Sequence, residues 1–284
     1  MEKKKMKPGA FFKRYIRVMA AGAVLVCIFL VAIFAPAVAT HDPHEADIYK
    51  MNQLPSEEHI MGTDMFGRDI FSRIIYGSRV SLLISITVNV LAIVIGTSLG
   101  LLVGYYRWAD QIIMRVLEGI NALPTIVFAI TLVTVLGDGL DKLIICLTVV
   151  NLPSIARLVR SQVLSIREKE FVECAKASGA SSARIMFKYI LPQCFSPLII
   201  RFTNGLGSTI LTQASLSFLG VGLDPRTPNW GGVINEGKNL VMVQPHQCAY
   251  AGLAIMITVL AFSILGDGVR DILDPKLRSR FIWS

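Results

Sequence analysis

Hydrophobic residues fall in long blocks along this chain and do not alternate with polar residues. A bilayer core about 30 Å thick is crossed by roughly 20 apolar residues in a helix, so each block of that length predicts one membrane-spanning helix. We expect an all-α polytopic membrane protein with six transmembrane helices and no separate soluble domain. The predicted spans cover about residues 18–38, 80–104, 117–136, 143–158, 197–219 and 249–265.

The composition agrees with this pattern and excludes an ordinary soluble protein. Hydrophobic residues make up 53% of the 284 positions and charged residues 17%, with a mean hydropathy of +0.58. The five cysteines lie in predicted spans, at a span edge or in a basic region, so we expect no disulfide framework.

A net charge of +8 could indicate a nucleic-acid partner, but the position of the charges argues otherwise. Six crossings place 21 of the 28 Lys and Arg residues on one side of the membrane. Basic residues of short loops favour the cytoplasmic side, so we expect both termini there and no nucleic-acid binding. This group comprises the basic residues of 3–17, 107–115, 157–188, Arg201 and 270–280.

The first hydrophobic block has two readings. The sequence Ala37-Val38-Ala39 after a basic start resembles a signal-peptide cleavage site. The apolar stretch of about 20 residues exceeds the 7–15 residues of a signal peptide's apolar region, so we favour a retained helix.

Residues 41–79 form a polar segment that the predicted topology places outside the cytoplasm. The stretch HDPHEAD brings together potential metal ligands, namely His41, Asp42, His44, Glu45 and Asp47. Imidazole and carboxylate groups bind borderline metals, but Pro43 and the absence of a helical context favour a solvated loop, and we assign no metal site here.

Polar residues within the predicted spans are candidates for lining a substrate path. They could equally form hydrogen bonds between packed helices, and the sequence does not separate the two roles. Pro124 and Pro153 predict bends in their helices. The candidates are Asn89, Asn121, Asn151, Thr209 and Gln213.

A polar and basic region, residues 167–193, interrupts the apolar pattern. Residues 166–177 favour a helix, Gly179 suits a left-handed stop, and Ser181 can cap a second short helix that extends to Ile190. Pro192 predicts the end of that helix. The expected helix–turn–helix could dock into a partner protein or lie on anionic lipid, and its glutamates favour docking.

This region resembles the EAA loop of ABC importer permeases, with Cys174 in place of the usual second alanine. The matching positions are Glu173, Cys174, Ala175, Gly179, Ala180, Leu191 and Pro192. A second match is similar to the GTDxxGRD signature in the C-type permease subunit of dipeptide, oligopeptide and nickel importers. Its positions are Gly62, Thr63, Asp64, Gly67, Arg68 and Asp69.

The resemblance implies a type I ABC importer permease fold with cytoplasmic coupling helices, in the cytoplasmic (inner) membrane. It implies a homologous B-type permease subunit, two cytoplasmic ABC ATPase subunits and an extracytoplasmic substrate-binding protein as partners. ATP and Mg²⁺ would be used by the ATPases, with no cofactor on this chain, which has no GxxxxGK[ST] phosphate loop. Membrane lipid surrounds such a subunit.

Three regions follow from the pattern and the resemblance together. Residues 1–40 form the cytoplasmic tail and first helix, residues 41–79 the extracytoplasmic segment, and residues 80–284 a five-helix permease core with the coupling loop 167–193.

The expected function is import of di- or oligopeptides by alternating access, with nickel or a metallophore as the alternative cargo. A membrane enzyme would show motifs such as HExxH or GxSxG, which are missing from the sequence. A secondary transporter or channel would more often carry mid-span charges or inverted repeats. We therefore expect a translocation subunit without catalytic residues.

Overall fold

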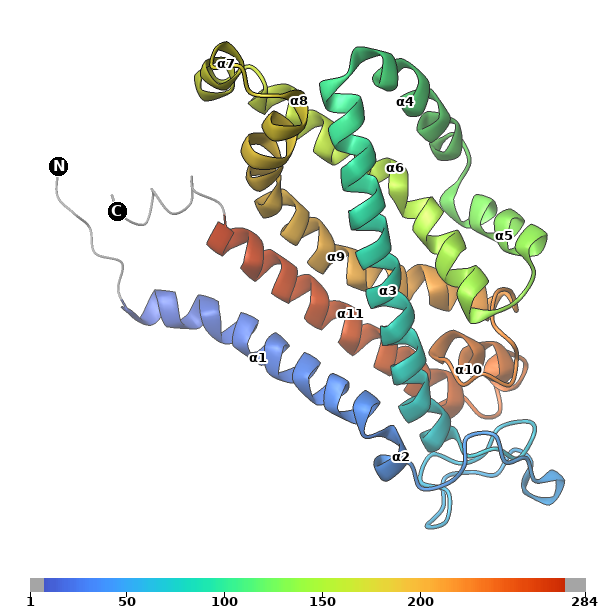
Figure 1. Cartoon of the computed structure of the whole chain (residues 1–284). Coiled ribbons are helices and arrows are strands. Elements are labelled where there is room, and N and C mark those ends of the chain that lie inside the picture. Colours follow the sequence, from blue (N-terminus) through green and yellow to red (C-terminus); the bar gives the residue numbers. More distant parts are fainter. Residues whose placement is uncertain (1–7, 274–284) are drawn as a thin grey trace.

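The computed structural model describes residues 8–273, in which helices are joined by loops and no strand forms. The basic residues predicted for the tail before Pro8 and for the end after Leu273 lie outside this range. Five long helices make the frame (Figure 1). They are α1 (Pro8–Ile33), α3 (Ile70–Tyr105), α6 (Leu140–Ile166), α9 (Leu191–Phe218) and α11 (His246–Leu273).

Shorter helices connect the frame and close its two ends. They are α2 (Ala35–Val38), η1 (Ile48–Lys50), α4 (Arg107–Asn121), α5 (Thr125–Leu136), α7 (Glu170–Ala177), α8 (Ser182–Arg184), the π-helix η2 (Ile185–Ile190), α10 (Trp230–Gly237) and η3 (Lys238–Leu240). Helices α7 and α8 lie at one end of the bundle, which we call the α7 end (Figure 1). Helix α10 and the loops of residues 39–69 lie towards the opposite end, which we call the α10 end.

Within residues 8–273, four helices are long and apolar enough to cross a membrane, namely α1, α3, α6 and α11. The pair α4 and α5 makes a fifth crossing if it is one bent span. Helix α9 has the required length, at 28 residues, but is less apolar. This arrangement is compatible with the six predicted crossings.

The predicted span 117–136 is not one continuous helix. Helix α4 ends at Asn121, α5 begins at Thr125, and the two axes differ in direction by 97°. Pro124 takes an extended backbone, with φ −54° and ψ 130°. Because proline lacks an amide proton and disfavours a helical residue before it, the helix cannot run through Leu123-Pro124.

Helix α3 begins at Ile70, ten residues before the predicted span 80–104. The boundary of the extracytoplasmic segment at residue 79 stays a prediction, because the start of a helix does not mark the edge of the membrane. Residues 70–79 include Arg73 and Arg79, and these charges hid the start of the helix in the hydrophobic pattern.

Close packing of α3 against α6 forms the centre of the bundle. Gly96, Gly100 and Gly104 recur every four residues along one face of α3. A Cβ atom on these glycines would lie 2.5–2.9 Å from the side chains of Ile155, Val159 and Val163 on α6, which recur with the same spacing. Small residues at this spacing let two membrane helices approach until backbone meets side chain.

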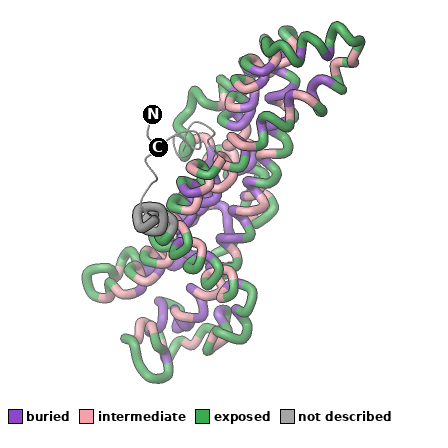
Figure 2. The backbone as a smooth tube through the Cα atoms, turned by 90° about the vertical axis from the view of Figure 1, so that its left-hand side faces the viewer, coloured by how far each residue is buried: buried purple, intermediate pink, exposed green. Residues whose placement is uncertain are grey.

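The burial pattern is that of a protein surrounded by lipid. Figure 2 shows buried residues where the helices cross and exposed residues along their outer sides. Large apolar side chains lie on those outer sides, for example Val94 of α3 and Leu30 of α1. Several polar side chains, including Ser85 and Thr258, are fully buried.

Candidate functional site

Helix α7 is held at the α7 end by a small apolar anchor. Val172 is fully buried and packs in one cluster with Ile166 of α6 and with Ile185 and Ile190 of η2. Ala175, one turn further along, is also buried. The anchor fixes the position of α7 through its inner face.

The outer face of α7 is exposed in the described chain. It carries two acidic residues, one basic residue, an aromatic ring and a thiol: Glu170, Glu173, Lys176, Phe171 and Cys174. A short helix with a fixed base and an uncovered mixed face is suited to insertion into a groove of another protein.

Gly179 ends α7 in the way the sequence predicts. Its φ is +77°, and the two hydrogen bonds of a Schellman turn form around it: Ala180 N donates to Ala175 O, and Gly179 N donates to Lys176 O, both at 3.0 Å. Ser181 then caps the next helix, because its hydroxyl accepts from Arg184 N. The turn between the two helices is confirmed.

Two predictions for this region are wrong. Ile166 is the last residue of α6, and α7 begins only at Glu170. Pro192 does not stop the second helix, because η2 continues directly into α9. The wider π turn has Leu191 N donating to Met186 O, directly before Pro192, which has no amide proton to donate. The continuous helix accommodates the proline beside this π turn.

At the α10 end, the GTDxxGRD residues build the start of α3. The Asp69 carboxylate accepts from Ser72 N at 2.8 Å and caps the helix. Gly62 and Gly67 both have positive φ, and a Cβ on either would overlap a backbone oxygen of residues 47–53. The signature is therefore a folded turn that only glycine permits at these two positions.

Four charged residues of this end form a neutral, nearly buried network. Arg68 Nε lies 2.7 Å from Asp64 Oδ2, and Arg68 Nη2 lies 2.9 Å from Glu236 Oε2. Arg73 Nη2 lies 3.0 Å from Glu236 Oε1 and its Nε 3.5 Å from Asp64. Burial raises the pKa of the Glu236 carboxyl, and the two guanidinium groups oppose that shift. The network joins α10 to the signature and to α3.

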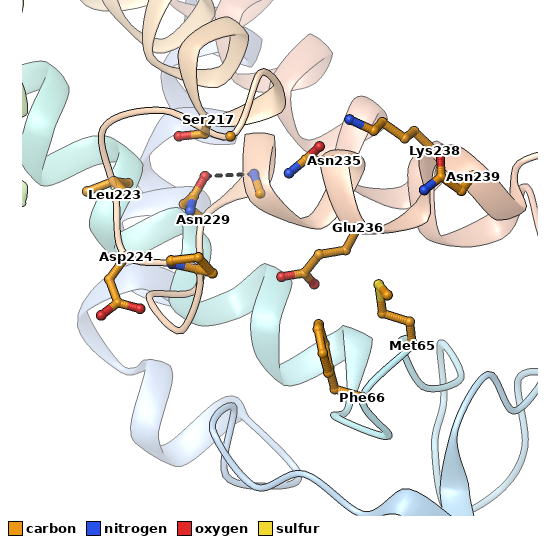
Figure 3. A pocket seen from close by; sticks show the side chains of 13 residues that line it. Met65, Phe66, Ser217, Leu223, Asp224, Asn229, Asn235, Glu236, Lys238 and Asn239 are labelled. Carbon is orange, nitrogen blue, oxygen red and sulfur yellow. Dashed lines mark hydrogen bonds between the residues drawn. The ribbon is translucent and has the colours of Figure 1, made fainter. Parts of the chain in front are cut away.

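A cavity of about 340 Å³ lies beside this network. Figure 3 shows Glu236 and Asn229 facing it, with Phe66 and Met65 of the signature on another side. Its lining mixes acidic, amide and apolar groups, which suits a polar ligand with some apolar surface.

The predicted path residues occupy different environments. Asn89 and Thr209 meet between α3 and α9, where Asn89 Nδ2 donates to Thr209 Oγ1 at 2.9 Å, and both are buried. Gln213 is buried beside Ser217, to which its Nε2 donates at 3.1 Å. In this chain alone Asn89 and Thr209 form a contact between helices, and Gln213 forms a hydrogen bond within α9. Their role in a path stays a prediction.

Asn121 and Asn151 are nearer the surface. Asn121 is exposed at the end of α4. Asn151 is half-buried on α6, and its side chain lies 3.5 Å from Arg201 Nη2, which also donates to Ser154 Oγ at 2.9 Å. The structure therefore brings Asn151 to a cationic side chain, and leaves Asn121 apart.

Sequence reasoning missed Glu236 and the bonding of Arg201. Glu236 lies in α10, but the sequence around it is rich in Gly, Pro and Asn and predicted a turn-rich loop without a motif. Arg201 follows the predicted start of its span by four residues, so it counted as a flanking charge.

Two family models match the chain. One, described as the binding-protein-dependent transport system inner membrane component, matches residues 92–279. The other, described as the N-terminal TM domain of oligopeptide transport permease C, matches residues 11–55.

Relatives match the chain along nearly its whole length. The chain is 40% identical to the glutathione transport system permease protein GsiD of Pectobacterium atrosepticum, over 95% of this chain and 91% of that protein. It is 43% identical to the dipeptide transport system permease protein DppC of Alkalihalophilus pseudofirmus, over 91% and 86%. Inward-facing structures of the MetNI methionine ABC transporter are 20% identical, and one superposes with a TM-score of 0.58 over 71% of this chain and 96% of that one. That likeness concerns the fold.

Proposed function

The chain belongs to the family of inner membrane components of binding-protein-dependent transport systems, and from this premise we propose that it is a permease subunit of an ATP-driven peptide importer. The observation that carries the proposal is the identity of 40–43%, along nearly the whole chain, to permeases named for dipeptide and glutathione transport. Glutathione is itself a tripeptide, so short peptides unite the two cargoes. We set nickel aside because these names favour peptides.

The proposed complex pairs this chain with a homologous permease subunit, two cytoplasmic ATPase subunits and an extracytoplasmic substrate-binding protein. The exposed face of α7 is the proposed contact with an ATPase. Glu173 and Cys174 lie on this face, Ala175 is buried beneath it, and Gly179 and Ala180 form the turn that follows. Leu191 and Pro192 begin the helix that carries the movement into the membrane. ATP and Mg²⁺ are used by the ATPases, and this chain performs no covalent chemistry.

The direction of the chain follows from the same proposal. The α7 end faces the cytoplasm together with both termini, and the α10 end faces outwards, where the cavity near Glu236 would meet arriving peptide. Transport then consists of a rigid-body switch between inward-open and outward-open states, driven by the difference in ATP affinity of the two states.

The test is uptake of radiolabelled dipeptide into vesicles that hold the reconstituted complex. Wild-type complex should accumulate dipeptide with ATP, and excess unlabelled dipeptide should compete while Ni²⁺ should not. Glu173→Lys, which reverses one charge on the exposed face, should remain in the membrane and lose ATPase association. Glu168→Lys, also exposed but outside α7, is the matched control. Normal uptake by Glu173→Lys would contradict the coupling role, and competition by Ni²⁺ alone would contradict the cargo.

A further inference from the structure

Three residues at the α10 end gather into a group that no step of the proposed transport uses. His41 follows α2, and Glu58 and His59 precede the GTDxxGRD signature. One potential ligand atom from each lies within 4.8 Å of the other two. Two imidazoles and a carboxylate are the ligands that borderline divalent cations such as Zn²⁺ take in proteins.

Asp69 holds the histidine pair in place. Its Oδ1 lies 3.0 Å from His59 Nδ1 and 3.8 Å from His41 Nδ1, while its Oδ2 caps α3 through Ser72 N. The Asp69 side chain is 1% exposed, so it cannot turn away into solvent. A buried carboxylate that binds one ring nitrogen fixes the tautomer and leaves the other nitrogen free to coordinate a metal.

The second ring nitrogen of His59, Nε2, is free to coordinate a metal in this way. His59 Nε2 is buried and has no hydrogen-bond partner among the described residues, and the side chain is 5% exposed. Leaving a buried polar atom unpaired is unfavourable, and a bound cation would give His59 Nε2 the partner that it lacks. The side chains of Glu58 and His41 are 59% and 32% exposed, and they leave an entry route from solvent.

We propose that His41, Glu58 and His59 bind one borderline divalent cation, with Asp69 positioning the His59 ring. Glu58 is paired with Lys50 Nζ at 2.5 Å in the described chain, and the cation would replace this exposed ammonium partner. The ion would link His41, which lies shortly after α2, to Glu58 and His59 in the loop that precedes α3. Within HDPHEAD only His41 belongs to the group, because Asp42 instead accepts from His44 N at 2.8 Å in a local turn.

The test uses the full-length chain, purified in detergent through a tag without histidine and stripped with a chelator. Zn²⁺ is the probe, and calorimetry and elemental analysis measure binding. One Zn²⁺ per chain and an increase in Tm are expected for the wild type, and both should be lost in His41→Ala and His59→Ala. His44→Ala is the matched control, because this exposed histidine lies three positions from His41 and outside the group, and it should bind as the wild type does.

Glu58→Gln keeps the experiment decisive if a histidine variant fails to fold. Glu58 is exposed, so its replacement leaves the packing intact, and Zn²⁺ affinity should fall by on the order of 10-fold or more. The proposal is overturned if the wild type binds no Zn²⁺, if Glu58→Gln binds as tightly as the wild type, or if His44→Ala loses binding equally. Dipeptide uptake is not part of the readout, so failure here leaves the transport proposal standing.

Discussion

At the scale of single residues, Gly179 is a position where the backbone conformation by itself favours glycine. A Cβ there would meet no atom within 4 Å, so space does not exclude a larger residue. What excludes it is the φ of +77°, since a left-handed conformation costs an L-residue roughly 1–2 kcal/mol and a β-branched one the most.

Gly179→Val should therefore weaken the turn between α7 and α8 without changing any packed contact. We expect lower ATP-dependent uptake at normal membrane abundance, because the α7 face is then held less firmly. The measurement is uptake in reconstituted vesicles. Gly179→Asn is the control, because asparagine tolerates left-handed dihedrals, and it should retain most transport. Equal transport by the valine variant would show that the turn geometry does not matter.

Glu236 is the second residue whose environment makes a sharp prediction. It neutralises two buried guanidinium groups, so Glu236→Gln leaves Arg68 and Arg73 with only Asp64 as a charged partner. Breaking a buried ionic pair costs about 3–5 kcal/mol. We expect a clearly lower Tm of the purified chain in detergent. Asp224→Asn alters an exposed carboxylate of the same cavity and should leave Tm unchanged; similar losses in both variants would refute a special role for the network.

At the scale of elements, the contact between α3 and α6 depends on three missing side chains. At Gly100 an added Cβ would meet both a side chain and the backbone of α6, since it would lie 2.5 Å from Val159 Cβ and 2.9 Å from Ala156 O. Overpacking of this kind costs roughly 1–3 kcal/mol.

Gly100→Val should destabilise the chain by separating α3 from α6, and thermal unfolding in detergent measures the loss. Gly252→Val is the matched control, since Gly252 lies inside α11 with no atom within 4 Å of an added Cβ. An equal change in Tm for the two variants would mean that the valine itself, and not the close approach of the helices, is responsible.

The sequence predicted each long helix, but it did not predict where the helices end or break. The apolar blocks located every long helix, because burial in lipid demands the same composition from each. Arg73 and Arg79 concealed the first turns of α3, since their charges are neutralised or solvated in ways that only the folded chain reveals. Pro124 and Pro192 both follow a leucine, yet the helix breaks at Pro124 and runs through Pro192.

The same limit applies to the candidate sites. The helix stop at Gly179 was predictable, because its cause is local. The pairing of Glu236 with Arg73 spans 163 positions, and that of His41 with His59 joins loops on either side of η1. Contacts of this kind depend on the tertiary arrangement, which a hydrophobic pattern does not encode.

At the scale of the whole molecule, the proposed orientation can be tested with the chain's own cysteines. Cys146 and Cys194 are buried and Cys27 lies in α1, whereas Cys174 is exposed on α7. A membrane-impermeant maleimide should therefore label Cys174 in inverted membrane vesicles and not in intact cells. Cys174→Ser should remove that signal. Labelling of Cys174 from outside intact cells would reverse the assigned direction of the whole chain.

The π-helix between α8 and α9 sets the rotational phase between the coupling end and the membrane helix. A π turn contains one more residue than an α turn, and each residue of an α-helix advances the chain by about 100° around its axis. Deleting one residue from Ile185–Ile190 would let an ordinary α-helix form there, but α7 would then point about 100° away from its present direction relative to α9. The extra residue of the π turn therefore sets the direction in which α7 points around the axis of α9.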